Sequence, residues 1–149
     1  MSKKIEKVLL VTHPTRDEAI AAACELTKLL TQQKIEVFAT NSIIGAKEFE
    51  DSKSVDIALV LGGDGTMLRA AQICRGKNTP VLGINLGHVG FLAEIDRPSM
   101  SEIAQAIVGG DFSIEERMSL DYKLIRSGQI IESGWALNEV LVERNDHQM

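Results

Sequence analysis

The stretch LGGDGT, residues 61–66, places an aspartate among three glycines directly after the apolar run 55–60. A glycine-rich turn between a strand and a helix exposes successive backbone N–H groups at the helix N-terminus, where the helix dipole also favours an anion. Phosphate is the natural ligand of such a turn.

The stretch departs from two common phosphate-binding patterns. It is not a Walker A loop, because no Gly-Lys-Ser/Thr follows. It also differs from the dinucleotide pattern G-x-G-x-x-G, because Leu68 stands at the third glycine. A different phosphate chemistry is therefore expected here.

Asp64 needs its own explanation, because a carboxylate inside a phosphate-binding turn repels the ligand. Its negative charge suits two roles, which are holding a metal ion and taking a proton from an attacking hydroxyl. Phosphoryl transfer needs both kinds of group, since positioning, charge neutralisation and a base or orienting group supply most of its catalysis. The competing interpretation is a tight turn in which Asp64 caps the following helix.

Strands that alternate with helices would position this loop. The apolar patterns predict strands at 7–11, 35–38, 55–61 and 81–84, and helices from about Thr15 to Gln32, at 66–75 and at 99–108. Residues 41–53 have a weak pattern and are predicted as a loop with about one helical turn. This order predicts an α/β fold with a doubly wound, Rossmann-like parallel sheet.

Start and stop signals support two of these helices. Thr15 and Glu18 have the spacing of a capping box at the start of the first helix. Pro98-Ser99 and Gly109-Gly110 are typical of the start and the end of the third helix.

The character of the chain changes after Asp111. Residues 120–126, the turn 127–128 and residues 129–135 resemble a β-hairpin, and 136–143 continue as extended chain. We therefore predict a nucleotide- or phosphate-binding α/β domain at 1–111. Residues 112–149 are predicted to begin an antiparallel, β-rich second domain that is truncated.

Composition narrows the classes of partner. The 149 residues are 44% hydrophobic and carry a formal charge of −5, with a pI near 5.2. These values disfavour binding to nucleic acid or to a membrane surface, which needs clustered Lys and Arg. Cys24 and Cys74 have no metal-binding spacing and are interpreted as reduced, buried thiols of a cytoplasmic protein.

Three stretches together carry a family resemblance. LGGDGTMLRAA at 61–71 resembles the GGDG signature shared by NAD kinases, by lipid kinases of the diacylglycerol and sphingosine type, and by phosphofructokinases. GINLGHVGFLAEI at 83–95 resembles the second glycine-rich block of NAD kinases, and ALNEVLVER at 136–144 resembles their Asn-Glu segment. Because the motifs occur in that family's order, the chain resembles the N-terminal part of a bacterial ATP- or polyphosphate-dependent NAD kinase.

The resemblance implies phosphoryl transfer from ATP or polyphosphate to the 2′-hydroxyl of the adenosine ribose of NAD, giving NADP. Asp64 would accept the hydroxyl proton. The residues that the resemblance places in the ligand site are Gly62, Gly63, Asp64, Gly65, Thr66, Arg69, Asn138 and Glu139. It also implies Mg²⁺ bound chiefly to the donor phosphates rather than to a separate protein metal site, and a homodimer or homotetramer.

Further ligand contacts are less specific. In the second glycine block, Asn85, Gly87 and Gly90 would let a ligand lie against the backbone and Phe91 would offer a flat surface, unless these glycines serve only positive φ. The phosphate-contact candidates are His88 in that block and, after the first strand, His13 with Arg16.

Two other functions stay open at this stage. One is a lipid or sugar kinase that shares GGDG, and the other is a non-catalytic nucleotide-binding module. The family continues into a larger β-rich domain that completes the NAD pocket, so the activity of these 149 residues alone is also left open.

Overall fold

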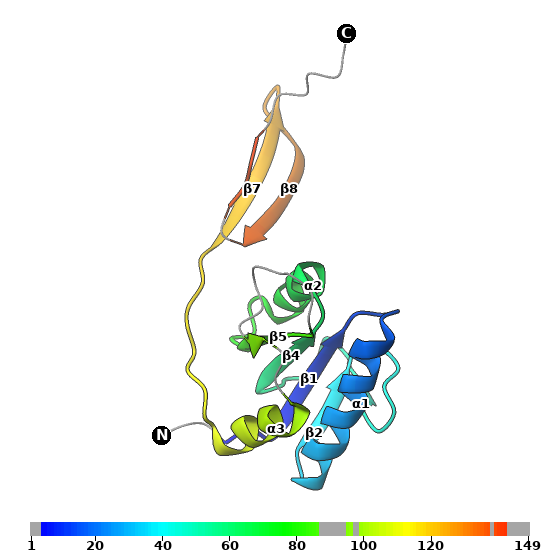
Figure 1. The fold of residues 1–149 in the computed structure, drawn as a ribbon. Coiled ribbons are helices and arrows are strands. Elements are labelled where there is room, and N and C mark those ends of the chain that lie inside the picture. Colours follow the sequence, from blue (N-terminus) through cyan, green and yellow to red (C-terminus); the bar gives the residue numbers. More distant parts are fainter. Residues whose placement is uncertain (1–3, 87–94, 97–98, 138, 143–149) are drawn as a thin grey trace. The chain divides into compact units, whose positions relative to one another are not determined.

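The computed structural model describes residues 4–86, 95–96, 99–137 and 139–142. The chain divides into two compact units, Met1–Ser113 and Ile114–Met149. The first unit contains a sheet with helices and the second contains a hairpin (Figure 1). Among the described residues, no helix is both long and apolar enough to cross a membrane.

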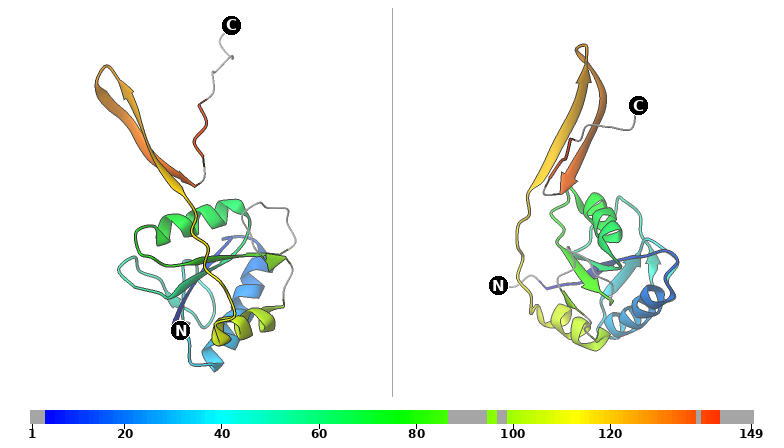
Figure 2. Two further views of the ribbon diagram at one scale, coloured as in Figure 1. Left: turned by 90° about the vertical axis from the view of Figure 1, so that its left-hand side faces the viewer. Right: turned by 45° about the horizontal axis from the view of Figure 1, so that its top comes forward.

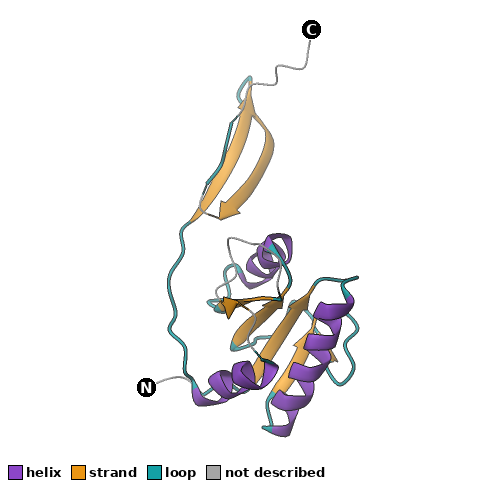
Figure 3. Ribbon diagram, in the orientation of Figure 1, coloured by secondary structure: helices purple, strands orange, loops and turns teal. Residues whose placement is uncertain are grey.

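The first unit is a parallel sheet with helices on both faces. Its elements are β1 (Lys7–Thr12), α1 (Asp17–Gln32), β2 (Glu36–Ala39), β3 (Lys47–Glu48), β4 (Ile57–Leu61), α2 (Asp64–Cys74), β5 (Val81–Asn85), β6 (Ile95–Asp96) and α3 (Met100–Gly109). The sheet order is β3-β2-β1-β4-β5-β6, and each neighbouring pair is parallel. Helices α1 and α3 cover one face and α2 covers the other (Figure 2). The predicted doubly wound, Rossmann-like sheet is confirmed, and Figure 3 separates its helices from its strands by colour.

The two central strands, β1 and β4, fill both halves of the core. Successive side chains of a strand point to opposite faces. Val8 and Leu10 of β1 therefore pack with α1 and α3, whereas Leu9 and Val11 pack with α2. All four are fully buried. Burial of one such side chain contributes about 1.5–3 kcal/mol, so these strands anchor the unit.

Helix α1 begins later than its sequence signal indicates. Its N-cap residue is Arg16, whose side chain makes no capping hydrogen bond. The backbone N–H of Thr15 donates instead to His13 Nδ1 at 3.3 Å. This contact belongs to the turn before the helix, so Thr15 stays outside the helix and the predicted Thr15–Glu18 capping box is wrong.

Helix α3 does contain a capping box. The Ser99 hydroxyl accepts from Glu102 N at 3.1 Å, and the Glu102 carboxylate accepts from Ser99 N at 3.0 Å. The hydrogen bonds from the Ser99 backbone and hydroxyl hold the pKa of Glu102 below its usual value. At the other end Gly110 is left-handed, with φ 71°. The predicted extent of this helix is confirmed, and Pro98 lies outside the described residues.

The start of α2 and the segment 41–53 differ most clearly from the predictions. Helix α2 begins at Asp64 rather than at residue 66. Residues 47–48 form strand β3, which pairs with β2, and residues 41–53 contain two hydrogen-bonded turns, 43–46 and 50–53, but no helix. The open edge of β2 offers backbone partners to this short segment, a long-range effect that a local apolar pattern does not report.

The second unit is the predicted hairpin, formed by β7 (Ser119–Arg126) and β8 (Gln129–Leu137). Its turn residues Ser127 and Gly128 both have positive φ, 50° and 77°, as a two-residue hairpin turn that follows the strand twist requires. Several large apolar side chains of the hairpin are exposed. They are Leu124, Ile125, Ile130 and Ile131.

The two cysteines differ in environment. Cys74 at the end of α2 is buried, and burial raises the pKa of its thiol to about 11. Cys24 in α1 is only partly buried, which corrects the expectation that both thiols are buried. Both thiols are free.

Replacing Ser99 by Ala should lower the free energy of unfolding by about 1 kcal/mol, because the helix loses its N-cap hydrogen bond. Thr15→Ala is the matched control and should cost clearly less, since Thr15 caps nothing. The part due to Glu102 is present above the unfolded pKa of about 4.3 and is lost as the pH falls through the lower folded value. Urea unfolding at pH 7 and pH 3.5 measures both effects, and equal losses in the two variants would contradict the assignment.

One thiol should react rapidly with a disulfide reagent such as Ellman's reagent at pH 8 in the folded protein. Cys24 is the expected site, because the thiolate is the reactive form and the raised pKa keeps Cys74 protonated. Cys24→Ser should remove the fast phase, whereas Cys74→Ser should leave it. Both thiols should react in denaturant, and a fast phase that disappears with Cys74→Ser would refute this ordering.

Candidate functional site

The candidate site lies where the strand order reverses. Strands β2 and β3 lie on one side of β1, and β5 and β6 lie on the other side of β4. In open α/β sheets, ligands bind at such a point, outside the carboxyl ends of the strands. There Thr12 pairs with Leu61, and His13 N donates to Leu61 O at 3.1 Å. The β1–α1 loop and the glycine loop therefore leave the sheet side by side.

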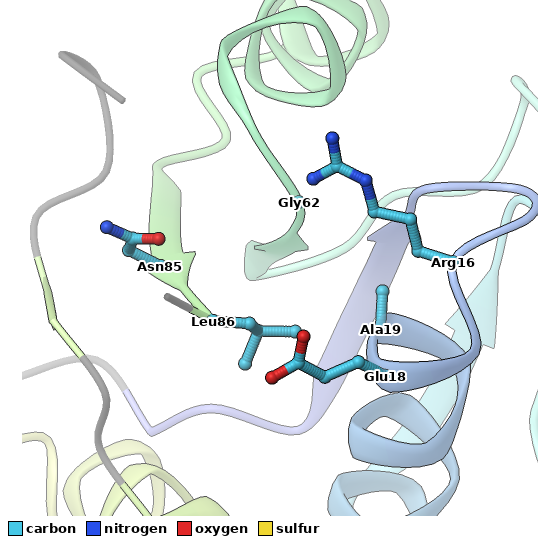
Figure 4. Close-up of a pocket in the computed structure, with 6 residues that line it drawn as sticks. All are labelled: Arg16, Glu18, Ala19, Gly62, Asn85 and Leu86. Carbon is cyan, nitrogen blue, oxygen red and sulfur yellow. The ribbon is translucent and has the colours of Figure 1, made fainter. Parts of the chain in front are cut away.

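A small pocket opens at this point (Figure 4). Its lining residues are Arg16, Glu18, Ala19, Gly62, Asn85 and Leu86. The guanidinium of Arg16 extends on the side of Gly62, whereas the carboxylate of Glu18 lies toward Leu86 (Figure 4). The pocket thus joins the start of α1, the glycine loop and the end of β5, which are far apart in sequence.

Asp64 is the first residue of α2 and is partly exposed. The N-cap is Gly63, with extended backbone at φ −91° and ψ −166°. A capping aspartate would occupy that position and not the first turn of the helix. The structure therefore does not give Asp64 the capping role, although a carboxylate in a first turn still interacts favourably with the helix dipole.

The fold explains one glycine of the loop and leaves two unexplained. A Cβ at Gly62 would lie 2.5 Å from Thr66 Oγ1 and 2.8 Å from Thr66 Cβ, so the buried Thr66 requires glycine there. A Cβ at Gly63 or Gly65 would meet nothing within 4 Å. None of the three has positive φ. The open space at Gly63 and Gly65 is what close approach of a ligand to the backbone requires.

Gly65 is also unfavourable for the helix that contains it. Glycine within a helix costs up to about 1 kcal/mol relative to alanine. Gly65 is exposed in the first turn of α2, where alanine would fit. Folding alone would therefore favour alanine at this position.

The other predicted site residues are distributed as follows. Asn85 ends β5 and lines the pocket, and His13 is held in the β1–α1 loop by its contacts with Thr15 and Leu61. Arg69 is exposed on α2. Glu139 is an exposed residue that follows β8 in the second unit. The predictions on Asn138, Gly87, His88, Gly90 and Phe91 lie outside the described residues.

Sequence reasoning missed one residue that supports this edge. Asn41, just after β2, donates through Nδ2 to both Thr12 O and Thr12 Oγ1 at 2.9 Å. These bonds hold the end of β1 directly before His13. A polar residue two positions after an apolar strand was the available signal. It is informative only once β2 is known to lie beside β1.

Alanine substitutions should separate the structural glycine from the two others. Gly62→Ala should lower the free energy of unfolding by about 1–3 kcal/mol, because the new Cβ overlaps Thr66. Gly63→Ala should cost clearly less than Gly62→Ala, because no clash arises and only the N-cap preference for glycine over alanine is lost, whereas Gly65→Ala should raise stability by up to about 1 kcal/mol. Urea unfolding of the three variants measures this order. Strong destabilisation by Gly63→Ala or Gly65→Ala would show that the fold itself needs those glycines.

Comparison with known proteins identifies a family that the chain resembles over most of its length. Residues 8–112 match the family model of the ATP-NAD kinase N-terminal domain. The chain is 44% identical over 156 residues to the NAD kinase of Corynebacterium diphtheriae, covering 94% of this chain and 49% of that protein. It is 38% identical over 159 residues to the NAD kinase of Mycobacterium bovis, covering 92% and 52%. The chain thus spans about half the length of the curated relatives it matches.

A solved structure shares the fold. The crystal structure of yeast NADH kinase complexed with NADH matches with a TM-score of 0.72 and 18% identity, over 91% of this chain and 47% of that one. At this identity the match supports the fold alone, whereas the family model covers most of the first unit. On that match and on the sequence relatives, the chain belongs to the NAD kinase family, in the part that corresponds to the ATP-NAD kinase N-terminal domain.

Proposed function

We propose that the protein containing this chain transfers a phosphoryl group from ATP or polyphosphate to the 2′-hydroxyl of the adenosine ribose of NAD, giving NADP. The observation that carries the proposal is the glycine loop. Gly63 and Gly65 leave open space beside the Asp64 carboxylate at the switch point of the sheet. Membership of the NAD kinase family supplies the acceptor and the donor.

Asp64 would act on the acceptor. As the ribose oxygen bonds to the terminal phosphorus of the donor, the bond from that phosphorus to the bridging oxygen breaks, and the shortened donor leaves with the bond's electron pair. The hydroxyl proton passes to the Asp64 carboxylate. A carboxylate is a weak base for an alcohol, so its help comes late, when the hydroxyl has become acidic. Such assistance is worth about 10²–10⁴-fold in rate, or roughly 3–5 kcal/mol.

Other residues of the chain would bind the ligand phosphates and the NAD ribose. The backbone at Gly62, Gly63 and Gly65, with Thr66, would bind phosphate at the N-terminus of α2, and Arg69 would reach ligand phosphate or ribose. Asn138 and Glu139 would bind the NAD ribose and adenosine, because a carboxylate accepts from ribose hydroxyls and an amide both donates and accepts. Residues 112–149 would then begin the NAD-binding domain.

Mg²⁺ would accompany the donor. Among the described side chains, no group of three or more His, Cys, Asp or Glu could hold a metal ion. Mg²⁺ keeps several of its waters and commonly binds through substrate phosphates, so the donor phosphates would be its main ligands here, which leaves Asp64 for the acceptor hydroxyl. The cation would neutralise donor charge, while this chain's residues position the phosphates.

A homodimer or homotetramer is part of the same proposal.

The Asp64→Asn variant tests the catalytic role. NADP formation from NAD, ATP and Mg²⁺ should fall by about 10²–10⁴-fold, because the amide does not take the hydroxyl proton. NAD affinity and the free energy of unfolding should change little, since asparagine is nearly isosteric. The measurement uses a protein of the relatives' full length, with the 149-residue chain assayed in parallel.

Two outcomes would count against the proposal. Unchanged turnover in Asp64→Asn would remove the base role, and binding without turnover in the unsubstituted protein, with either donor, would favour a non-catalytic nucleotide-binding module. If the protein formed a phosphorylated lipid or sugar and no NADP, another kinase with the GGDG motif would be the better assignment.

A further inference from the structure

We infer that Arg16 binds the phosphate chain of the phosphoryl donor, at the Gly62 end of the glycine loop. The inference rests on the proposed function and adds to it a residue from a different loop. Its basis is the pocket in Figure 4, where the β1–α1 loop and the glycine loop meet.

The position of Arg16 is well defined. It is the N-cap residue of the 16-residue helix α1, so its backbone is fixed by the start of that helix. The preceding loop is tied to the sheet by the bond from His13 N to Leu61 O, at 3.1 Å, and by the bonds from Asn41 to Thr12. The guanidinium extends from this point on the side of Gly62 (Figure 4). It therefore lies next to the loop whose space at Gly63 and Gly65 admits a ligand.

The charge of Arg16 is unused by the fold. Within the described part of the chain, the guanidinium forms no ion pair or hydrogen bond, although the residue is partly buried. A planar guanidinium presents paired N–H donors that match two oxygens of a phosphate group. A phosphate chain that runs from the glycine loop into the pocket would meet these donors.

Glu18 limits where an anion can lie. Its carboxylate lines the same pocket but extends toward Leu86, away from the Gly62 side (Figure 4). An anion would be repelled from that wall and attracted to the wall formed by Arg16 and Gly62. The charges of Arg16 and Glu18 therefore favour a phosphate on the glycine-loop side of the pocket.

The chemistry of phosphoryl transfer indicates that Arg16 binds the phosphate donor and not the pyrophosphate of NAD. Asp64, which would serve the acceptor hydroxyl, is not among the residues that line the pocket. In-line transfer separates the attacking oxygen from the leaving oxygen, on which negative charge develops. A cation at the other end of the loop from Asp64 is placed to stabilise that leaving charge.

The test uses four versions of a protein of the relatives' full length, namely the unsubstituted protein, Arg16→Ala, Arg16→Lys and Arg75→Ala. Arg75 is the matched control, because it is an exposed arginine at the C-terminal end of α2. The first measurement is calorimetric titration with inorganic tripolyphosphate. Arg16→Ala should weaken binding by about 10- to 100-fold, as expected for loss of a charge-assisted hydrogen bond. Arg16→Lys should recover part of the affinity, and Arg75→Ala should bind like the unsubstituted protein.

Steady-state kinetics distinguish the two possible sources of phosphate. Arg16→Ala should raise the KM for ATP by about 10-fold or more and leave the KM for NAD within about 2-fold. A raised KM for NAD alone would place the guanidinium on the acceptor pyrophosphate and overturn the donor assignment.

The proposed function and the inference can fail separately. Absence of NADP formation by the unsubstituted protein would remove the function, and the tripolyphosphate titration would then decide the role of Arg16. Equal affinity of the unsubstituted protein and Arg16→Ala, or no binding by the unsubstituted protein, would overturn the inference even if NADP is formed.

Discussion

The parallel pairing of β1 with β4 is the constraint on which the site depends. The five residue pairs from Val8–Ile57 to Thr12–Leu61 join two strands whose side chains are buried on both faces. The helices that follow these strands, α1 and α2, cover opposite faces of the sheet (Figure 2). The two loops therefore start together at the carboxyl edge and then diverge, which opens the space between them. The pocket between Arg16 and Gly62 depends on this divergence.

Glycine lowers the local stability of the loop at positions where a ligand would need space. Gly65 lowers the helix propensity of α2, and Gly63 provides no side-chain cap hydrogen bond at the helix start. The buried pattern of β4, with all five residues in the core, offsets these losses. A functional loop can be locally suboptimal because it follows directly from the most strongly anchored strand. Gly62 has a structural cause instead, because the buried Thr66 occupies the space that a side chain at position 62 would need.

Much of this arrangement can be predicted from the sequence, and the failures have physical causes. Continuous apolar runs identify β1 and β4, because parallel strands covered on both faces carry no polar alternation. The Ser99–Glu102 capping box forms, whereas the similar Thr15–Glu18 signal does not, because Thr15 is held in the turn by His13. Strand β3 depends on the free edge of β2, a long-range pairing that short patterns do not report.

The candidate site shows the same division between local and long-range information. The glycine loop is visible in six consecutive letters. The pocket beside it joins Arg16, Gly62 and Asn85, and their proximity depends on strand order, which no single motif specifies. The sequence nominates Arg16 and Asn85 as separate candidates, but the fold is needed to show that they share a pocket with Gly62.

The two units differ in whether their described residues could form a rigid binding site. The first unit has a core on each face of its sheet, so a phosphate-binding loop can be rigid there before a ligand arrives. The second unit is a two-stranded hairpin with Ile125, Ile130 and Ile131 exposed, and two strands alone are marginally stable in water. Under the proposed function, the phosphates would therefore meet a preorganised site. Recognition of the NAD ribose by Asn138 and Glu139 would depend on whatever surface covers the apolar side chains of the hairpin.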